Sequence, residues 1–194
     1  SEERIDDYVR KHLFYPLGMS STSFTPKNVG QWYARSIPPT EMDTIYRKSL
    51  VQADVHDERA YYMDGVAGHA GLFSNTIDMA KYVTFLLNGG YYGGQRYLSE
   101  HLIQEFTTAQ NSLSGRGLGF DVKSRSDFSS AGTLMSNKSF GHTGFTGTSF
   151  WVDPDEKLGV ILLTNRVHPY RSYGSRISAI RAAVADAAYE AVSK

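Results

Sequence analysis

The sequence has 194 residues, a length that suits one domain or two small ones. Twenty lysines and arginines balance twenty aspartates and glutamates, and no basic stripe stands out, so we expect no nucleic-acid partner. No apolar run approaches the ~20 residues that a membrane-spanning helix needs. The chain has no cysteine, which excludes disulfide bonds, a thiol nucleophile and cysteine-ligated zinc.

The first part of the chain is predicted to be a helix followed by a long loop. Apolar residues recur at helical spacing from Ile5 to Leu13, which predicts a helix over residues 2–14 that ends before Pro16. Residues 20–52 lack periodicity, so we expect a long ordered excursion there. Residues 53–75 follow and are rich in small side chains.

Two helices and a hairpin are predicted next. Asn75 is placed to cap a helix that the Asn-Gly-Gly sequence at 88–90 ends. Residues 91–97 are typical of a tight hairpin around two glycines. Ser99 then starts a short helix. The residues of this short helix that we expect to face inward are Leu102, Ile103 and Phe106.

The second half is predicted to be mainly strand. Residues 118–122 and 140–152 have strand character, and a turn at 154–157 leads into the apolar run 158–163. A continuous apolar run is typical of a strand buried on both faces. A last helix is predicted over 175–192. The packing face expected for this helix comprises Ile177, Ile180, Val184, Ala187 and Ala191.

This order of elements predicts an α+β fold in which an antiparallel sheet is covered by helices. Residues 1–110 would form the mainly helical and loop part. Residues 111–194 would form the sheet and the C-terminal helix. An open edge of such a sheet favours association, so we also expect self-association through an unpaired strand edge.

The densest functional signal is GHTGFTGT at residues 141–148. Glycine weakens a strand and usually marks close approach by a ligand or another backbone. On one strand, His142 and Thr143 would point to alternate faces. Free main-chain N–H groups at such a place can bind an oxyanion or a peptide-like substrate. The alternative for His142 is a structural role in the strand.

This run and the Asp-Pro pair at 153–154 resemble the third active-site motif of serine β-lactamases and penicillin-binding proteins. That motif usually begins with lysine, whereas many esterases and peptidases of the family have histidine, as at His142. Residues 16–19 (PLGM), 68–74 (GHAGLFS) and 162–166 (LLTNR) also resemble family segments. The resemblance implies the C-terminal half of a β-lactamase/transpeptidase-like domain, most similar to a bacterial subgroup that includes DD-carboxypeptidase-like proteins.

The family nucleophile lies in a Ser-x-x-Lys motif, and none of the eight lysines here has a serine three positions before it. The resemblance therefore implies that the nucleophile lies upstream and that this chain alone is inactive. In the complete protein, the serine would attack an amide or ester carbonyl. The N–H of Phe145 would bind the tetrahedral oxygen, His142 would move a proton or bind a carboxylate, Thr143 would bind the substrate and Gly144 would admit the acyl group.

Four further residues are candidate substrate contacts. Asn165 matches a position that contacts the substrate carboxylate in class C relatives, and its alternative role is to close the strand. His56, Asp57 and His69 either border the cleft or tie the long excursion to the following helix by hydrogen bonds. A metal site formed by these three is a third alternative, although their spacing fits no local zinc pattern. We expect no metal and no cofactor.

The favoured function is thus a serine hydrolase that forms an acyl-enzyme with a cell-wall peptide, a β-lactam or an ester. A non-catalytic module that binds peptidoglycan or a partner is the alternative, and a metalloenzyme is a third. The partner would be a small-molecule or peptide substrate. The resemblance implies a periplasmic, cell-envelope or extracellular location in a bacterium.

Overall fold

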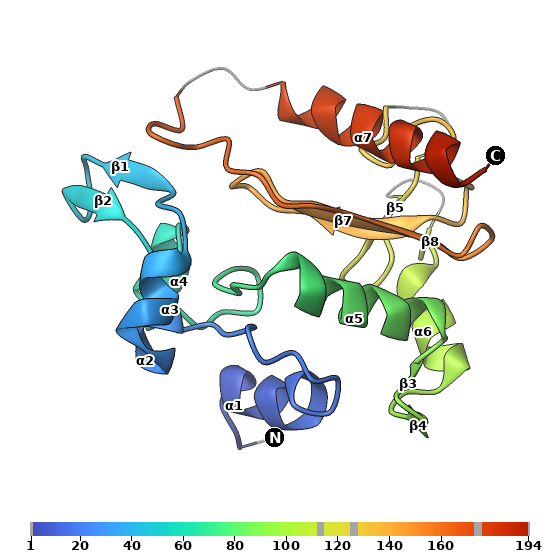
Figure 1. The fold of residues 1–194 in the computed structure, drawn as a ribbon, viewed down its shortest axis with the longest axis horizontal. Coiled ribbons are helices and arrows are strands. Elements are labelled where there is room, and N and C mark those ends of the chain that lie inside the picture. Colours follow the sequence, from blue (N-terminus) through green and yellow to red (C-terminus); the bar gives the residue numbers. More distant parts are fainter. Residues whose placement is uncertain (1, 112–114, 125–127, 173–175, 194) are drawn as a thin grey trace. The chain divides into compact units, whose positions relative to one another are not determined.

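The computed structural model describes residues 2–111, 115–124, 128–172 and 176–193, and the chain forms two compact units. The first unit runs up to Met79 and includes the segment that begins at Asn165. The second unit contains Ala80–Thr164 and the C-terminal helix. Each unit has its own elements, which are drawn in Figure 1.

The first unit is built from short elements. In chain order they are α1 (Ile5–Val9), the π-helix η1 (Arg10–Phe14), α2 (Pro26–Val29), α3 (Gln31–Ser36), β1 (Glu41–Asp43), β2 (Ser49–Val51) and α4 (Glu58–Tyr61). The helix predicted over 2–14 is confirmed from Ile5 to Phe14, with its second half wound as a π-helix. The excursion over 20–52 contains two helices and a hairpin, and each of these is too short for its apolar residues to show a helical or strand periodicity.

Helix α5 (Thr76–Leu87) begins in the first unit and continues in the second. Its predicted cap is confirmed, because the amide of Asp78 donates to Asn75 Oδ1 at 2.9 Å. The buried Asp78 carboxylate in turn accepts from the Ser21 amide at 2.7 Å and the Thr22 hydroxyl at 2.9 Å. These bonds tie the segment after η1 to the start of α5.

The second unit is an antiparallel sheet with helices on both faces (Figure 1). Its sheet order is β5 (Asp121–Val122), β6 (Phe140–Thr143), β7 (Ser149–Asp153) and β8 (Leu158–Leu162). The other elements are the hairpin β3 (Tyr91–Tyr92) and β4 (Gln95–Arg96), with helices α6 (Glu100–Thr107) and α7 (Ile177–Val192). The α+β class with a helix-covered antiparallel sheet is therefore confirmed.

Packing on the two faces defines the core of the second unit. On one face, Trp151 and Val160 of the sheet form a buried cluster with Ala185 of α7. On the other, α5 packs so closely that a Cβ at Gly159 would lie 2.2 Å from a methyl group of Val83. The interior of a protein is packed too densely to absorb such an addition.

Burial differs from the prediction in three elements. In α6, Phe106 is 40% exposed and Thr107 is buried instead, so Phe106 is not an inward residue. In β8, Val160 is buried, Ile161 is half-buried and Gly159 is exposed, and β8 has a single neighbouring strand in the described sheet. The run 158–163 is therefore not buried on both faces.

The predicted packing face of α7 is only partly confirmed, because Val184 packs against the buried cluster whereas other members of that face are exposed. Ile180 is 47% exposed, and Ala187 and Ala191 face solvent. The buried positions are Arg181 and Ala185, one residue further round the helix. The hydrophobic pattern does not predict this face. An arginine is rarely buried unless it has hydrogen-bond partners, and the sequence does not show which residues those partners are.

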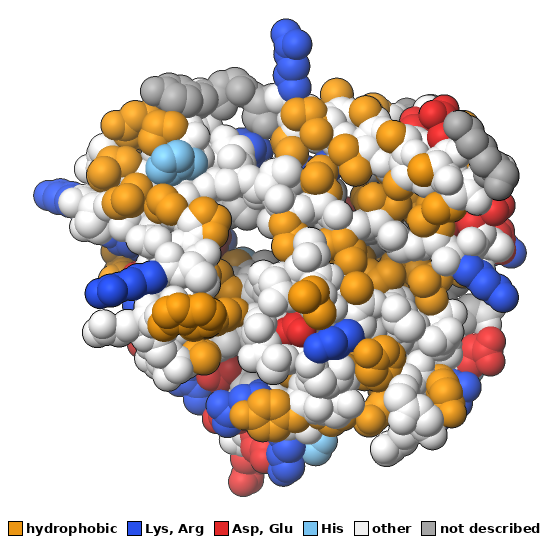
Figure 2. Space-filling model, viewed as in Figure 1, with side chains coloured by type: hydrophobic (Ala, Val, Ile, Leu, Met, Phe, Trp, Pro, Cys, Tyr) orange, Lys and Arg blue, Asp and Glu red, His pale blue; other side chains and the backbone are white. Residues whose placement is uncertain are grey.

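Charges of both signs are interspersed with hydrophobic side chains on the face of the molecule that Figure 2 shows. This distribution agrees with the balance of twenty basic and twenty acidic residues. Within the described ranges, every helix is too short or too polar to cross a membrane.

Candidate active site

The motif at 141–148 begins on strand β6. Gly141 pairs with Trp151 and His142 pairs with Phe150 on the antiparallel neighbour β7. A Cβ at Gly141 would lie 2.0 Å from the Phe150 carbonyl oxygen. A side chain at position 141 would therefore separate the two strands, which is the close backbone approach that the glycine signal predicted.

The strand ends at Thr143, and residues 144–148 form the turn that leads into β7. The prediction of a single strand over 140–152 is therefore wrong. The Gly144 amide donates to the Thr148 carbonyl at 2.7 Å, and the Gly147 amide donates to the Gly144 carbonyl at 3.1 Å. The repeated glycines serve this reversal, because a Cβ at Gly144 would lie 2.3 Å from Thr148 Oγ1.

Two side chains from outside the motif hold this turn. Arg181 of α7 donates from Nη2 to the carbonyls of Gly144 and Thr148, at 2.7 and 2.8 Å. Thr164, just after β8, donates its hydroxyl to the Gly147 carbonyl at 2.9 Å. The turn is thus fixed from a helix and from a strand end, which is how a rigid scaffold positions a functional loop. Sequence analysis did not identify either residue.

The motif side chains reach solvent. His142 is exposed, and Phe145 is 58% exposed at the tip of the turn. His142 Nδ1 lies 2.9 Å from the Thr143 carbonyl oxygen, which can only accept. In the neutral ring, Nδ1 therefore carries the hydrogen and Nε2 carries the lone pair. A histidine in this tautomer can accept a proton at Nε2.

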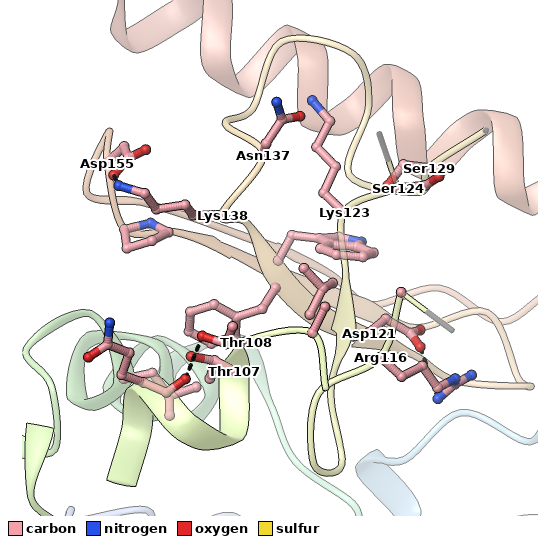
Figure 3. Close-up of a pocket in the computed structure, with 18 of the residues that line it drawn as sticks. Thr107, Thr108, Arg116, Asp121, Lys123, Ser124, Ser129, Asn137, Lys138 and Asp155 are labelled. Atoms are coloured by element: carbon pink, nitrogen blue, oxygen red, sulfur yellow. Dashed lines mark hydrogen bonds and ion pairs between the residues drawn. The ribbon is translucent and has the colours of Figure 1, made fainter. Parts of the chain in front are cut away.

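Thr143 lines a cavity of about 1350 Å³ within the second unit. Its wall also contains residues from α6, β5 and the loop before β6 (Figure 3). Lys138 pairs with Asp155 at 2.8 Å and Arg116 with Asp121 at 2.9 Å, so these charges are matched. The cavity is large enough for a peptide-sized ligand and has a mixed polar and apolar lining. No sequence pattern predicts this cavity.

The candidate contacts His56, Asp57, His69 and Asn165 all belong to the first unit. His56 is buried, and its Nε2 lies 2.7 Å from Glu41 Oε2. Arg171 donates from Nε to the same carboxylate, at 2.7 Å to Oε2. Burial opposes ionisation of Glu41, but the bonds from Arg171 and His56 outweigh it and lower its pKa to about 2. Burial also lowers the pKa of His56, more than Glu41 raises it.

Asp57 and His69 form a second, more exposed pair. His69 Nε2 lies 3.1 Å from Asp57 Oδ1, and the two side chains are 55% and 37% exposed. Asp57 also caps α4 by accepting from the Ala60 amide at 2.8 Å. This bond, followed by the contact with His69, lowers the pKa of Asp57. The pair is thus a charged, solvent-accessible feature on a defined helix end.

Asn165 holds the chain internally. Its Nδ2 donates to the Pro39 carbonyl at 2.6 Å, and its Oδ1 accepts from the Val167 amide at 3.2 Å. These bonds are consistent with the role of closing the chain after β8. Among the described residues, no three or more His, Asp or Glu side chains are grouped to hold a metal ion, and His56 and His69 each face a different carboxylate.

A protein-family model and curated bacterial proteins both match most of the chain. A family model described as Beta-lactamase matches residues 1–185. A curated protein of Escherichia coli K12, named "Putative D-alanyl-D-alanine carboxypeptidase", is 36% identical over 176 residues. The match covers 84% of this chain and 40% of that protein, so the chain spans about two fifths of its relative.

Solved structures show the same fold. A β-lactamase of Mycobacterium bovis aligns with 97% of this chain and 56% of its own, at 21% identity and a TM-score of 0.63. A penicillin-binding protein homologue of Caulobacter crescentus aligns with 96% of this chain and 52% of its own, at 15% identity and a TM-score of 0.63. The predicted resemblance is confirmed, and the chain belongs to the beta-lactamase family.

Proposed function

We propose that the protein to which this chain contributes is a serine hydrolase that forms an acyl-enzyme. The substrates are a cell-wall peptide ending in D-alanyl-D-alanine, a β-lactam or an ester, and the first is favoured by the name of the 36% identical relative. The chain would be the C-terminal portion of one β-lactamase-like domain. The bacterial relatives support a location in the periplasm, the cell envelope or outside the cell.

The observation that carries this proposal is the solvent-facing end of β6. His142 is exposed with its Nε2 lone pair available, and it lies two residues before a turn that Arg181 and Thr164 fix. Main-chain N–H groups of a fixed turn are suited to stabilise developing negative charge, because their dipoles need no reorganisation during the reaction.

The chemical steps follow from this arrangement. A serine outside these residues attacks the substrate carbonyl carbon, and the carbonyl oxygen becomes an oxyanion near the Phe145 N–H. The oxyanion then collapses and expels the leaving amine or alkoxide, which takes up the proton that the serine hydroxyl lost on attack. Water then attacks the resulting ester, which releases a carboxylic acid and restores the serine hydroxyl. His142 is proposed to assist this proton movement or to bind the substrate carboxylate. Thr143, in the cavity wall, is proposed to hydrogen-bond the substrate.

The first-unit candidates differ in how well they suit substrate binding. The Asp57–His69 pair is accessible to solvent, so we propose it as a substrate contact. His56 and Asn165 also remain candidates, but their internal bonds favour a structural role for both. Nothing in the chemistry proposed for these residues requires a metal or a cofactor.

The test is covalent labelling of the whole protein with a fluorescent penicillin and a fluorophosphonate. His142→Ala should reduce the rate of labelling by roughly 10²-fold if the side chain moves a proton. His101→Ala, an exposed histidine on α6, is the matched control and should label normally. A wild-type protein that takes neither label but binds peptidoglycan would establish the non-catalytic alternative.

A further inference from the structure

We propose that Arg181 is a positioning residue that polarises the Gly144–Phe145 peptide group and makes its N–H a stronger hydrogen-bond donor. This inference deepens the proposed function, because that N–H is the one assigned to the oxyanion. Arg181 does not contact the substrate in this proposal, and it acts through the main chain of the turn.

The evidence begins with the connectivity of the peptide group. Arg181 Nη2 lies 2.7 Å from the Gly144 carbonyl oxygen, and that carbonyl belongs to the same planar amide as the Phe145 N–H. A cation at the oxygen favours the resonance form with positive charge on nitrogen, so the N–H becomes more acidic. Hydrogen bonds in such a chain strengthen one another.

The burial of Arg181 increases this effect. The side chain is 7% exposed, and a charge acts more strongly in the interior than in water. The same Nη2 also lies 2.8 Å from the Thr148 carbonyl, which itself accepts from the Gly144 amide at 2.7 Å. The guanidinium therefore bridges both ends of the turn and fixes the orientation of the peptide group as well as its charge.

Thr164 also holds the turn, and it shows what an uncharged hydrogen-bond donor contributes. Thr164 holds the Gly147 carbonyl with a hydroxyl at 2.9 Å, three peptide groups along the chain from the proposed donor. An uncharged hydroxyl is sufficient to fix the turn at Gly147. A charged donor bonds the Gly144 carbonyl, which shares its amide group with the Phe145 N–H. Charge-assisted hydrogen bonds are roughly twice as strong as neutral ones.

The experiment uses the whole protein with Arg181→Gln, Arg181→Lys and Thr164→Val. Arg181→Gln keeps an N–H donor without the charge, Arg181→Lys keeps the charge, and Thr164→Val removes the neutral anchor. We expect Arg181→Gln to lower kcat about tenfold with KM changed less than about twofold, since the donor acts mainly in the transition state. Arg181→Lys should retain more activity than Arg181→Gln, and Thr164→Val should lose less than about threefold.

A second readout does not depend on activity. Selective ¹⁵N-phenylalanine labelling reports the Phe145 amide proton, which should move upfield in Arg181→Gln and less in Arg181→Lys or Thr164→Val. An unshifted amide, equal kcat for the Gln and Lys variants, or losses that merely follow thermal stability would overturn the inference. A wild-type protein that forms no acyl-enzyme would refute the proposed function alone, and the amide shift would still decide the polarisation.

Discussion

Glu41 and Arg171 form an ion pair inside the first unit in which both carboxylate oxygens accept from the guanidinium, although 130 positions separate the two residues in the chain. Arg171 Nε lies 2.9 and 2.7 Å from the two carboxylate oxygens of Glu41, and its main-chain amide donates to Oε1 at 3.0 Å. Nη2 also reaches Glu58 at 2.6 Å. The pair therefore fixes the segment after Asn165 against strand β1 and helix α4.

Removing the charge of Glu41 should destabilise the protein strongly. In Glu41→Gln, Arg171 and His56 lose the charged carboxylate that they share, and one of its two acceptor oxygens is replaced by an NH2 donor. Because the Arg171 side chain is 36% exposed, the cost should be lower than that of breaking a fully buried pair, at about 2–3 kcal/mol. Urea unfolding followed by circular dichroism measures the change. Glu105→Gln, at an exposed position on α6, is the control and should stay within about 0.5 kcal/mol of wild type. Equal stability of the two variants would contradict the structural role of the pair.

The same cluster predicts loss of stability in acid. The pKa of His56 is lowered by burial from 6.5, so the unfolded state takes up a proton more readily as the pH falls below that value. The pKa of Glu41 is lowered from 4.5 to about 2, which adds a second loss of about 3 kcal/mol as the pH falls through that range. The free energy of unfolding should therefore be highest near neutral pH and decrease in two stages.

His56→Gln separates the two stages of that acid loss. This variant should flatten the dependence of unfolding free energy on pH between about 7 and 5, and leave the decline below pH 4.5 in place. The measurement is urea unfolding over that pH series. A wild-type curve that rises on acidification from neutral pH would show that His56 is stabilised in its charged form, contrary to its burial.

Asp153 should be essential to the loop before β6. This fully buried carboxylate accepts from the Ser136 amide at 2.6 Å and the Ser136 hydroxyl at 2.7 Å, and the amides at 155 and 156 also donate to it. Asp153→Ala leaves these donors unsatisfied and should cost about 3 kcal/mol. Asp155→Ala removes only a surface ion pair with Lys138 and should cost less than about 1 kcal/mol. Thermal unfolding of both variants is the comparison.

Variants at Gly144 and Thr148 test whether a glycine is needed at position 144 for folding of the turn, for entry of the substrate, or for both. In Gly144→Ala, the new Cβ would lie 2.3 Å from Thr148 Oγ1, so the variant should be destabilised by about 1–3 kcal/mol. Adding Thr148→Ala removes that hydroxyl and should restore stability. If Gly144 also admits the acyl group, the double variant should remain slow in penicillin labelling. Full recovery of labelling would limit the glycine to a role in folding.

The sequence predicts elements with a long or repeated pattern better than it predicts short ones. The cap at Asn75, the hairpin around 93–94 and the antiparallel pair of β7 and β8 are predicted from their capping and turn residues, whereas β6 and β7 are expected as one strand. The hairpin of β1 and β2 is not predicted, because its three-residue strands have no readable alternation. The position of this hairpin depends instead on the contact between Glu41 and Arg171. A local sequence pattern cannot predict that contact, because the two residues are far apart in the chain.

The candidate site shows the same limit. Glycine spacing indicates a functional segment at 141–148 but not the turn within it, and exposure of His142 is consistent with the motif. The packing face predicted for the last helix leaves out Arg181 because helical periodicity counts only apolar residues, whereas the carbonyls that accept from Arg181 lie 33 and 37 positions away. Buried polar groups take their partners from tertiary structure, and a single sequence does not contain that information directly.

The outer edge of β8 gives the last prediction. In the described sheet, this five-residue strand pairs with β7 alone, and Leu163 directly after it is 41% exposed. An unpaired edge of this kind can pair with a second copy about a two-fold axis.

We propose that the 194-residue chain self-associates through β8. Sedimentation velocity should show a weight-average mass that rises with concentration, and Leu163→Lys should move the distribution toward monomer, because a lysine beside an edge opposes strand pairing. Phe128→Lys, at a 63% exposed apolar position that is not part of β8, is the control for a general gain in solubility. A wild-type chain that stays monomeric at high concentration, or an equal effect of both lysines, would exclude the β8 edge as the contact.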